Sequence, residues 1–344
     1  MNAAEDGHWT YGSGTGHAGR VSTTADLHIP TIHDVLRAQA RLEGLLVRTP
    51  AARYGEIDRS AGANVVVKHE NLQHTGAFKV RGALNLLLGF DAAARERGIV
   101  AYSTGNHAQA LAYASRHTGT RCTVVMPEDP NPVKERAVRA LGAEVVLHGR
   151  AFDDARAHAT HLADMNGARL VAAADEPDLL AGVATSTLEL LQQAPDVDVL
   201  VVPVGGGSGA AAAAIVTTAL APHVDVVAVQ SASAPAAHDS WRAGELVTRP
   251  NTTRADGLAT GMGFALTQAV MREHLADFLL VSDDEIARAQ RLYLTAARTV
   301  AEGAGAAALA AVLADPERFS GRTVAVVCSG GNASEAELRR ALGA

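Results

Sequence analysis

The chain has 344 residues, of which 48% are hydrophobic, and its formal net charge is -7 at pH 7. This length and apolar content suit two units that each bury a core, and they exclude a globally disordered protein. Nucleic acid and anionic membranes require clustered positive charge, so the charge balance argues against both partners. The two cysteines, Cys122 and Cys328, lie in apolar runs, so we expect buried thiols in the cytoplasm and no disulfide framework.

Residues 1–28 are expected to form a disordered tail. The stretch 1–20 is rich in Gly, His, Ser and acidic residues and has no apolar core of the kind that a signal peptide needs. No apolar stretch of the sequence reaches membrane-spanning length without a polar interruption. We therefore expect no membrane partner.

Predicted strands and helices alternate through the first half of the chain. Apolar runs such as Val65-Val66-Val67 indicate buried strands, and segments with helical spacing lie between them. This alternation is typical of a parallel sheet with helices on both faces. The expected strands are 65–68, 98–102, 121–126, 144–147 and 170–173, and the expected helices are 31–46, 84–90, 110–117, 132–141, 153–166 and 176–193.

A second strand–helix series begins at Asp198. It predicts an α/β fold of two doubly wound parallel-sheet units that share one cleft. We expect a large domain of residues 29–95 plus 171–344 and a small domain of residues 96–170, with too little chain after Asn332 for a regulatory domain. The expected strands are 199–204, 224–229, 278–281 and 323–327, the expected helices are 210–220, 283–301 and 305–313, and the irregular stretch 231–263 is expected to line a site.

Lys79 is the first candidate for chemistry. A polar break at Thr75 precedes it and helical spacing begins at Ala83, so Lys79 stands where a loop enters a helix, beside Phe78. A desolvated lysine loses its proton more easily and can attack a carbonyl as an amine. A lysine at a helix start is more often a solvated charge, so the position alone leaves both interpretations open.

Three polar or glycine-rich loops follow predicted strands. In Gly205-Gly206-Gly207-Ser208-Gly209, backbone N–H groups and a helix N-terminus would bind an anion such as phosphate, although a plain flexible turn is the alternative. Ser103-Thr104-Gly105-Asn106-His107-Ala108-Gln109 suits either a carboxylate or ordinary helix capping. Ser329-Gly330-Gly331-Asn332 follows the last strand. The ends of parallel strands meet in one crevice, so we expect these loops to converge near Lys79.

A lysine, a phosphate cradle and a carboxylate loop together indicate pyridoxal phosphate acting on an amino acid. The aldehyde would condense with Lys79, and the ring would accept electrons from a carbanion at Cα.

With these motifs the chain resembles the fold-type II pyridoxal-phosphate enzymes of the threonine dehydratase and serine racemase group, whose fold is like that of tryptophan synthase β. The similarity runs from roughly Ile32 to Asn332. Four segments carry it in order, namely the Schiff-base motif (75–83), the substrate-carboxylate loop (103–109), the tetraglycine phosphate loop (205–209, with Ser208 replacing a glycine) and the C-terminal motif (329–332).

The resemblance implies a role for each candidate residue. Lys79 would hold the cofactor within the large domain and then move the Cα proton, Phe78 would pack against the ring, and Asn106 would bond its 3-oxygen. Ser329 would meet the pyridine nitrogen, where a neutral hydroxyl makes a weaker electron sink that suits β-elimination. The remaining implied contacts to the cofactor are Gly205, Gly206, Gly207, Ser208, Gly209 and Gly257, and the implied substrate contacts are Ser103, Thr104, Gly105, Asn106 and His107.

The sequence departs from the family pattern at several positions. Thr104 stands where dehydratases typically carry alanine and racemases carry a catalytic serine, so we include Thr104 as a possible second base. This loop and Ala301-Glu302-Gly303-Ala304 most resemble the dehydratase-like proteins of hydroxyectoine breakdown. Gln230 and Ala236 stand where the family's divalent-cation site usually needs carboxylates, and only Glu302 remains as a candidate ligand, so we predict a weak or absent metal site. Gly182-Val183-Ala184-Thr185 also departs, on the substrate side.

The leading hypothesis is therefore an ammonia-lyase of the dehydratase type. It would act on serine, threonine or a 3-hydroxy analogue and release a 2-oxo acid and ammonia. A β-replacement enzyme or racemase is the first alternative, and a non-catalytic binding protein that keeps the fold is the second. The resemblance also implies a homodimer.

Overall fold

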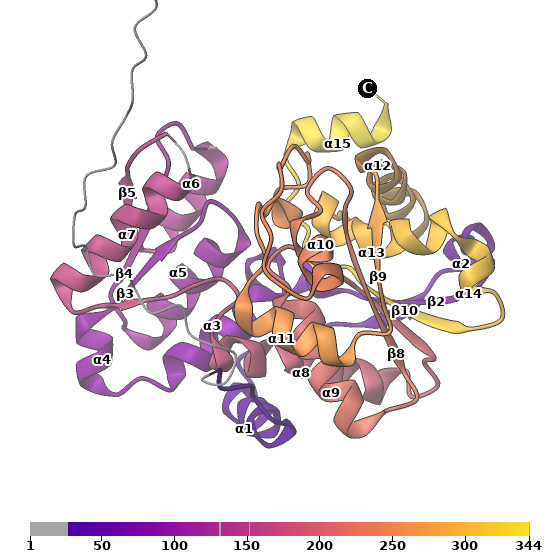
Figure 1. The fold of residues 1–344 in the computed structure, drawn as a ribbon, viewed down its shortest axis with the longest axis horizontal. Coiled ribbons are helices and arrows are strands. Elements are labelled where there is room, and N and C mark those ends of the chain that lie inside the picture. The colour runs from indigo at the N-terminus through magenta and orange to yellow at the C-terminus, as the bar shows by residue number, and fades with distance from the viewer. Residues whose placement is uncertain (1–26, 131, 151, 344) are drawn as a thin grey trace, which may run out of the picture.

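The computed structural model describes residues 27–343, except 131 and 151. Most of the predicted tail therefore lies outside the described residues. The described chain forms two lobes, each built around a sheet (Figure 1). In the smaller sheet, of order β5-β4-β3-β6, neighbouring strands pair in parallel. Its strands are β3 (Ile99–Tyr102), β4 (Cys122–Met126), β5 (Glu144–Leu147) and β6 (Arg169–Leu170), and α4 (Ala92–Arg97), α5 (Asn106–Thr118), α6 (Pro132–Ala140) and α7 (Phe152–Asn166) lie between or before them.

The larger sheet has the strand order β1-β2-β10-β7-β8-β9. Its strands pair in parallel apart from β1, which runs antiparallel to β2 at the edge. The strands are β1 (Ala51–Arg53), β2 (Asn64–Lys68), β7 (Val199–Pro203), β8 (Asp225–Ser231), β9 (Asp277–Val281) and β10 (Thr323–Val327). The helices are α1 (Ile32–Leu42), α2 (Gly55–Ala61), α3 (Lys79–Leu88), α8 (Pro177–Gln193), α9 (Ser208–Leu220), α10 (Ala236–Ala243), α11 (Ala265–His274), α12 (Asp283–Leu292), α13 (Gly303–Ala314), α14 (Pro316–Phe319) and α15 (Glu335–Leu342).

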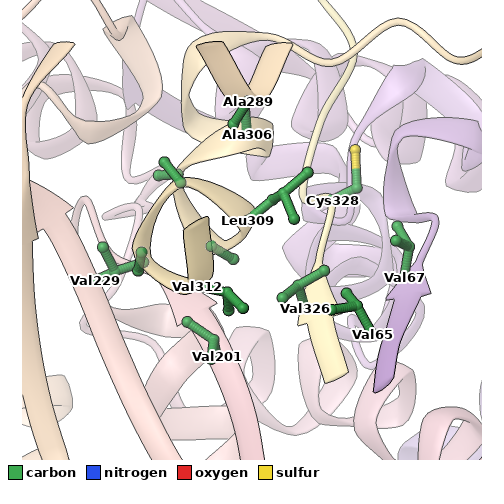
Figure 2. Packing of buried hydrophobic residues seen from close by; sticks show 14 of the residues in the cluster. Val65, Val67, Val201, Val229, Ala289, Ala306, Leu309, Val312, Val326 and Cys328 are labelled. Atoms are coloured by element: carbon green, nitrogen blue, oxygen red, sulfur yellow. The ribbon is translucent and has the colours of Figure 1, made fainter. Parts of the chain in front are cut away.

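Alternating strand residues bury both faces of this larger sheet. On one face, Leu309 and Val312 of α13 pack against Val201, Val229 and Val326 (Figure 2). On the other face, the strand residues that alternate in sequence with these pack against α8, α9 and α11. Since side chains alternate across a strand, a strand buried on both faces must be apolar throughout. The α/β prediction with parallel sheets covered on both sides is confirmed.

Several elements differ from the sequence-based expectation. The edge strand β1 and the short helix α2 were not predicted, because three and seven residues carry too little periodicity. The helix expected over 283–301 ends earlier, in a π-helical turn at Tyr293–Ala297 that stops at Arg298, a non-glycine residue with φ 53°. Helix α3 begins at Lys79 itself, so the lysine occupies its first turn.

We propose that the two sheets mark two domains, residues 29–95 plus 171–344 and residues 96–170. Strand membership supports this division, since β3 to β6 all lie within the second range. The boundary at residue 95 falls inside α4. Among the helices that the structure describes, none is long and apolar enough to cross a bilayer.

Candidate active site

Lys79 lies at the start of α3, with its amine turned toward the glycine-rich loop. Its Nζ donates to Ser208 Oγ at 2.7 Å and to the Ala173 carbonyl oxygen at 3.2 Å. Its Nζ also lies 5.1 Å from the ring centre of Phe78. Desolvation lowers the pKa of Lys79 from 10.5 to about 8. A substantial fraction of this amine is therefore neutral near physiological pH, as a nucleophile requires.

The loop before Lys79 is held by the C-terminal motif. Ala77 forms an antiparallel bridge with Gly330, and the Phe78 N–H donates to the Ser329 carbonyl oxygen at 3.1 Å. Asn332 Nδ2 donates to the Thr75 carbonyl oxygen at 2.8 Å. Hydrogen bonds therefore join the first and last motifs, which are about 250 residues apart in the chain, next to Lys79.

The glycine-rich loop connects β7 to α9 and is crowded on its inner side. A Cβ added at Gly205 would lie 2.3 Å from the Gly257 carbonyl oxygen, and one at Gly206 would lie 2.9 Å from the Ala174 Cβ. Gly207 has φ +90°, a backbone conformation that favours glycine. Glycine is thus required here by close approach and by backbone conformation, and the turn brings main-chain N–H groups to the start of α9.

Two threonines outside the predicted motifs brace this loop. Thr267 Oγ1 donates to the Gly206 carbonyl oxygen at 2.7 Å, and Thr260 Oγ1 donates to the Gly205 carbonyl oxygen at 3.2 Å. Thr260 lies between α10 and α11, and Thr267 lies in the first turn of α11. With these carbonyls engaged, the loop's N–H groups would be the ones to face a bound anion.

Asn106, at the first position of α5, joins a buried polar network. Its Nδ2 donates to Glu302 Oε1 at 2.5 Å, and its Oδ1 accepts from Asn332 Nδ2 at 2.8 Å. Burial raises the pKa of Glu302 to about 7, helped by the charges of Glu337 and Asp256 and opposed by the Asn106 hydrogen bond. Sequence reasoning considered Glu302 only as a metal ligand, and no sequence signal pairs it with Asn106 across 196 residues.

The rest of the predicted carboxylate loop lies between β3 and α5. Ser103 and Thr104 are partly exposed, and Ser103 Oγ accepts from the Gly105 N–H at 3.2 Å. The His107 ring is buried with Nε2 3.4 Å from the Val171 carbonyl oxygen. Burial, followed by the charge of Lys79, lowers the pKa of His107 to about 3, so this imidazole is neutral. Any carboxylate bound here would meet backbone N–H groups and hydroxyls rather than a histidine cation.

Phe78 and Ser329 line a single small cavity together with Gly209 of α9. Helix α8 contributes Val183 from the stretch that departs from the family pattern, and also Ser186 and Thr187. Lys79, Phe78, Ser329 and the glycine-rich loop are therefore brought together. Gly257, whose carbonyl oxygen faces Gly205, lines a neighbouring cavity with Glu302 and Asn332.

Gln230 plays a structural part where the family usually places a cation ligand. Its Oε1 accepts from the Ala237 and His238 N–H groups at 3.1 Å and 3.0 Å, which caps the start of α10. Within residues 27–343, as far as they are described, no group of three or more His, Cys, Asp or Glu side chains is arranged to hold a metal ion. The expected lack of a metal site stays a prediction.

The family described as pyridoxal-phosphate dependent enzyme matches residues 42–330. This chain belongs to that family. The resemblance inferred from the four motifs is confirmed, and pyridoxal phosphate is the cofactor.

Relatives of similar length bear related names. The L-threo-3-hydroxyaspartate ammonia-lyase of Pseudomonas sp is 38% identical over 307 residues, which cover 89% of this chain and 96% of that protein. An L-threonine ammonia-lyase of Geobacter sulfurreducens is 40% identical over 300 residues, 87% of this chain and 74% of that protein. The crystal structure of serine racemase from Dictyostelium discoideum superposes with a TM-score of 0.84 at 32% identity, covering 89% of this chain and 99% of that one.

The residues present fit the cofactor. The glycine-rich loop is a cradle that a Cβ would fill, and it lies beside an amine with a lowered pKa. Lys79 would be the amine that meets the cofactor aldehyde, and the start of α9 would take its phosphate. Phe78 and Ser329 line a cavity that also includes Gly209 of the same loop.

Proposed function

We propose that this protein is a pyridoxal-phosphate dependent ammonia-lyase that eliminates water from a β-hydroxy amino acid. The enamine formed would hydrolyse to a 2-oxo acid and ammonia. The observation that carries the proposal is the amine of Lys79, which lies 2.7 Å from Ser208 at the anion cradle with its pKa lowered to about 8.

Different residues of the chain would carry out the separate parts of this reaction. Bound pyridoxal phosphate supplies an electron sink for negative charge at Cα. Lys79 would take the Cα proton, since a base with a pKa near the operating pH is the most effective. Ser103, Thr104 and the N–H groups at the start of α5 would hold the substrate carboxylate. Ser329, which carries no charge, would leave the sink weak, and a departing hydroxyl group would relieve the developing carbanion.

The test is incubation of the purified holoenzyme with L-serine, L-threonine and 3-hydroxyaspartate while the 2-oxo acid is followed. The names of the relatives support all three as candidates. We expect turnover of at least one of the three amino acids and its loss in Lys79→Ala. Complete inactivity on all three with cofactor bound would contradict the proposal.

A racemase or β-replacement enzyme is the second candidate. Thr104 supports it, because its partly exposed hydroxyl lies in the loop where a second base would stand, and a serine racemase is among the similar structures. Chiral analysis of the recovered amino acid, with and without an added nucleophile, separates the candidates. If Thr104 is a second base, Thr104→Ala would abolish racemisation while leaving elimination.

We also propose that the protein is a homodimer in the cytoplasm. The location is supported by Cys122 and Cys328, which are buried free thiols. The dimer is supported only by the family resemblance. Light scattering on the purified protein tests it, and a monomer at micromolar concentration would contradict it.

A further inference from the structure

Ser208 is the one side chain of the glycine-rich loop that carries a reactive group, and it lies between two parts of the proposed site. It is the first residue of α9 and is 2% exposed. Its Oγ lies 2.7 Å from Lys79 Nζ, while its backbone belongs to the anion cradle. A hydroxyl is both a donor and an acceptor, so it can connect these two partners.

The direction of the hydrogen bonds follows from the charge on the lysine. A protonated Lys79 donates to Ser208 Oγ and to the Ala173 carbonyl oxygen, and the Ser208 proton must then point elsewhere. An anion at the start of α9 is the acceptor that this position favours. A neutral Lys79 Nζ can instead accept a hydrogen bond from the Ser208 hydroxyl. The hydroxyl therefore changes its donor direction with the protonation of Lys79.

We propose that Ser208 is a positioning residue that holds Lys79 Nζ against the cradle and relays a proton from it to the leaving group. The inference rests on the proposed function. After Lys79 has taken the Cα proton, its ammonium gives one proton to Ser208 Oγ. The hydroxyl's own proton passes to the departing oxygen as the Cβ–O bond breaks, and that oxygen leaves as water. Lys79 is neutral again, and no oxidant or reductant is needed.

The other groups that interact with Lys79 Nζ cannot relay its proton, which leaves Ser208 for this role. His107 is the titratable side chain whose pKa responds to the charge of Lys79, and it remains neutral because its pKa is about 3. The other hydrogen-bond partner of Lys79 Nζ is the Ala173 carbonyl oxygen, which accepts a hydrogen bond but has no proton to pass on.

The first test compares two leaving groups in Ser208→Ala. Elimination from L-serine needs a proton on the departing oxygen, whereas elimination of chloride from β-chloroalanine does not. We expect kcat on L-serine to fall at least about tenfold, within the range of general-acid effects, and kcat on β-chloroalanine to change less than about twofold. Ser208→Thr should restore the L-serine rate, and Ser115→Ala, another buried serine remote from the site, should change neither.

The second test uses the apoenzyme and needs no turnover. The pH midpoint of Lys79 modification by an amine reagent is measured by peptide mass spectrometry, with and without inorganic phosphate. In the wild type, phosphate should raise the midpoint by about one pH unit, because a nearby anion favours the ammonium. In Ser208→Ala the rise should fall to less than half of this value.

Equal losses of kcat on L-serine and on β-chloroalanine in Ser208→Ala, or no loss on either substrate, would overturn the relay. An unchanged phosphate response of Lys79 would overturn the coupling to the cradle. If the wild type eliminates nothing from any substrate, the proposed function fails, and the apoenzyme titration alone decides the role of Ser208.

Discussion

At the scale of single residues, the site depends on groups whose protonation is set by burial. The pKa of Lys79 is lowered to about 8 and that of Glu302 is raised to about 7, each toward the neutral form. The cause is the same, since desolvation disfavours a charge of either sign. Near pH 7 the neutral amine is therefore a minor but accessible form of Lys79, and Glu302 can hold a proton.

The carboxyl of Glu302 predicts a pH-dependent stability difference. Its folded pKa is raised, so the folded state prefers the protonated form, and this contribution is lost as pH rises through about 7. Glu302→Gln keeps an acceptor for Asn106 without the charge. We expect the variant to match the wild type near pH 4 and to be more stable at pH 8 by up to about 3 kcal/mol.

Denaturant unfolding at the two pH values measures this difference. Glu317→Gln, an exposed position on α14, is the control and should show no such pH trend. A Glu302→Gln variant less stable than the wild type at pH 8 would contradict the burial argument.

At the scale of elements, the glycine-rich loop can be tested by adding one methyl group. Gly205→Ala would place a Cβ 2.3 Å from the Gly257 carbonyl oxygen, so the cradle must open. We expect a loss of about 1–3 kcal/mol in stability from overpacking and at least a roughly tenfold weaker cofactor affinity. Gly55→Ala at the start of α2, where the nearest atom is the end of the Arg59 side chain at 3.7 Å, is the matched control. Fluorescence titration with pyridoxal phosphate gives the affinity, and wild-type binding would rule out the close approach.

Helix α3 is anchored two residues after Lys79 by Arg81. This guanidinium is fully buried and donates to Glu70 at 2.7 Å and 2.9 Å and to Glu189 at 2.8 Å through both terminal nitrogens. Breaking this network leaves the fully buried Glu70 carboxylate without its charged partner, whereas Glu189 keeps Lys68.

Arg81→Met should therefore destabilise the protein by about 3–5 kcal/mol. Arg339→Met breaks the Glu335 pair on the surface of α15 and should cost less than about 1 kcal/mol. Thermal unfolding of both variants makes the comparison, and equal effects would mean that the Arg81 network contributes no more than a surface pair.

The sequence predicted these elements unevenly. Strands β2, β7 and β10 were predictable because burial on both faces makes them continuously apolar. The turn at Tyr293–Ala297 and the edge strand β1 were not, because tertiary contacts rather than local periodicity determine them. The hydrogen bonds of Thr260 and Thr267 to the glycine-rich loop were not predicted for the same reason. The partner of a hydroxyl group in an irregular stretch cannot be inferred from the sequence.

At the scale of the whole molecule, the two lobes meet at the site. Lys134 on α6 of the smaller lobe forms an ion pair with Asp256, next to Gly257 of the larger lobe. Three strand-end loops were expected to converge near Lys79 because parallel strands end on one edge. Hydrogen bonds do connect these loops to Lys79, to Phe78 or to one another. Which side chains would touch was not predictable, as the links from Asn106 to Glu302 and Asn332 show.

The central claim is that Lys79 holds the cofactor in the cleft between these lobes. Borohydride reduction of the holoenzyme, followed by proteolysis and peptide mapping, tests it directly. We expect one reduced pyridoxyl label, on Lys79, and no label on the corresponding peptide of Lys79→Ala. A label on another residue, or no label on the cofactor-loaded protein, would contradict it.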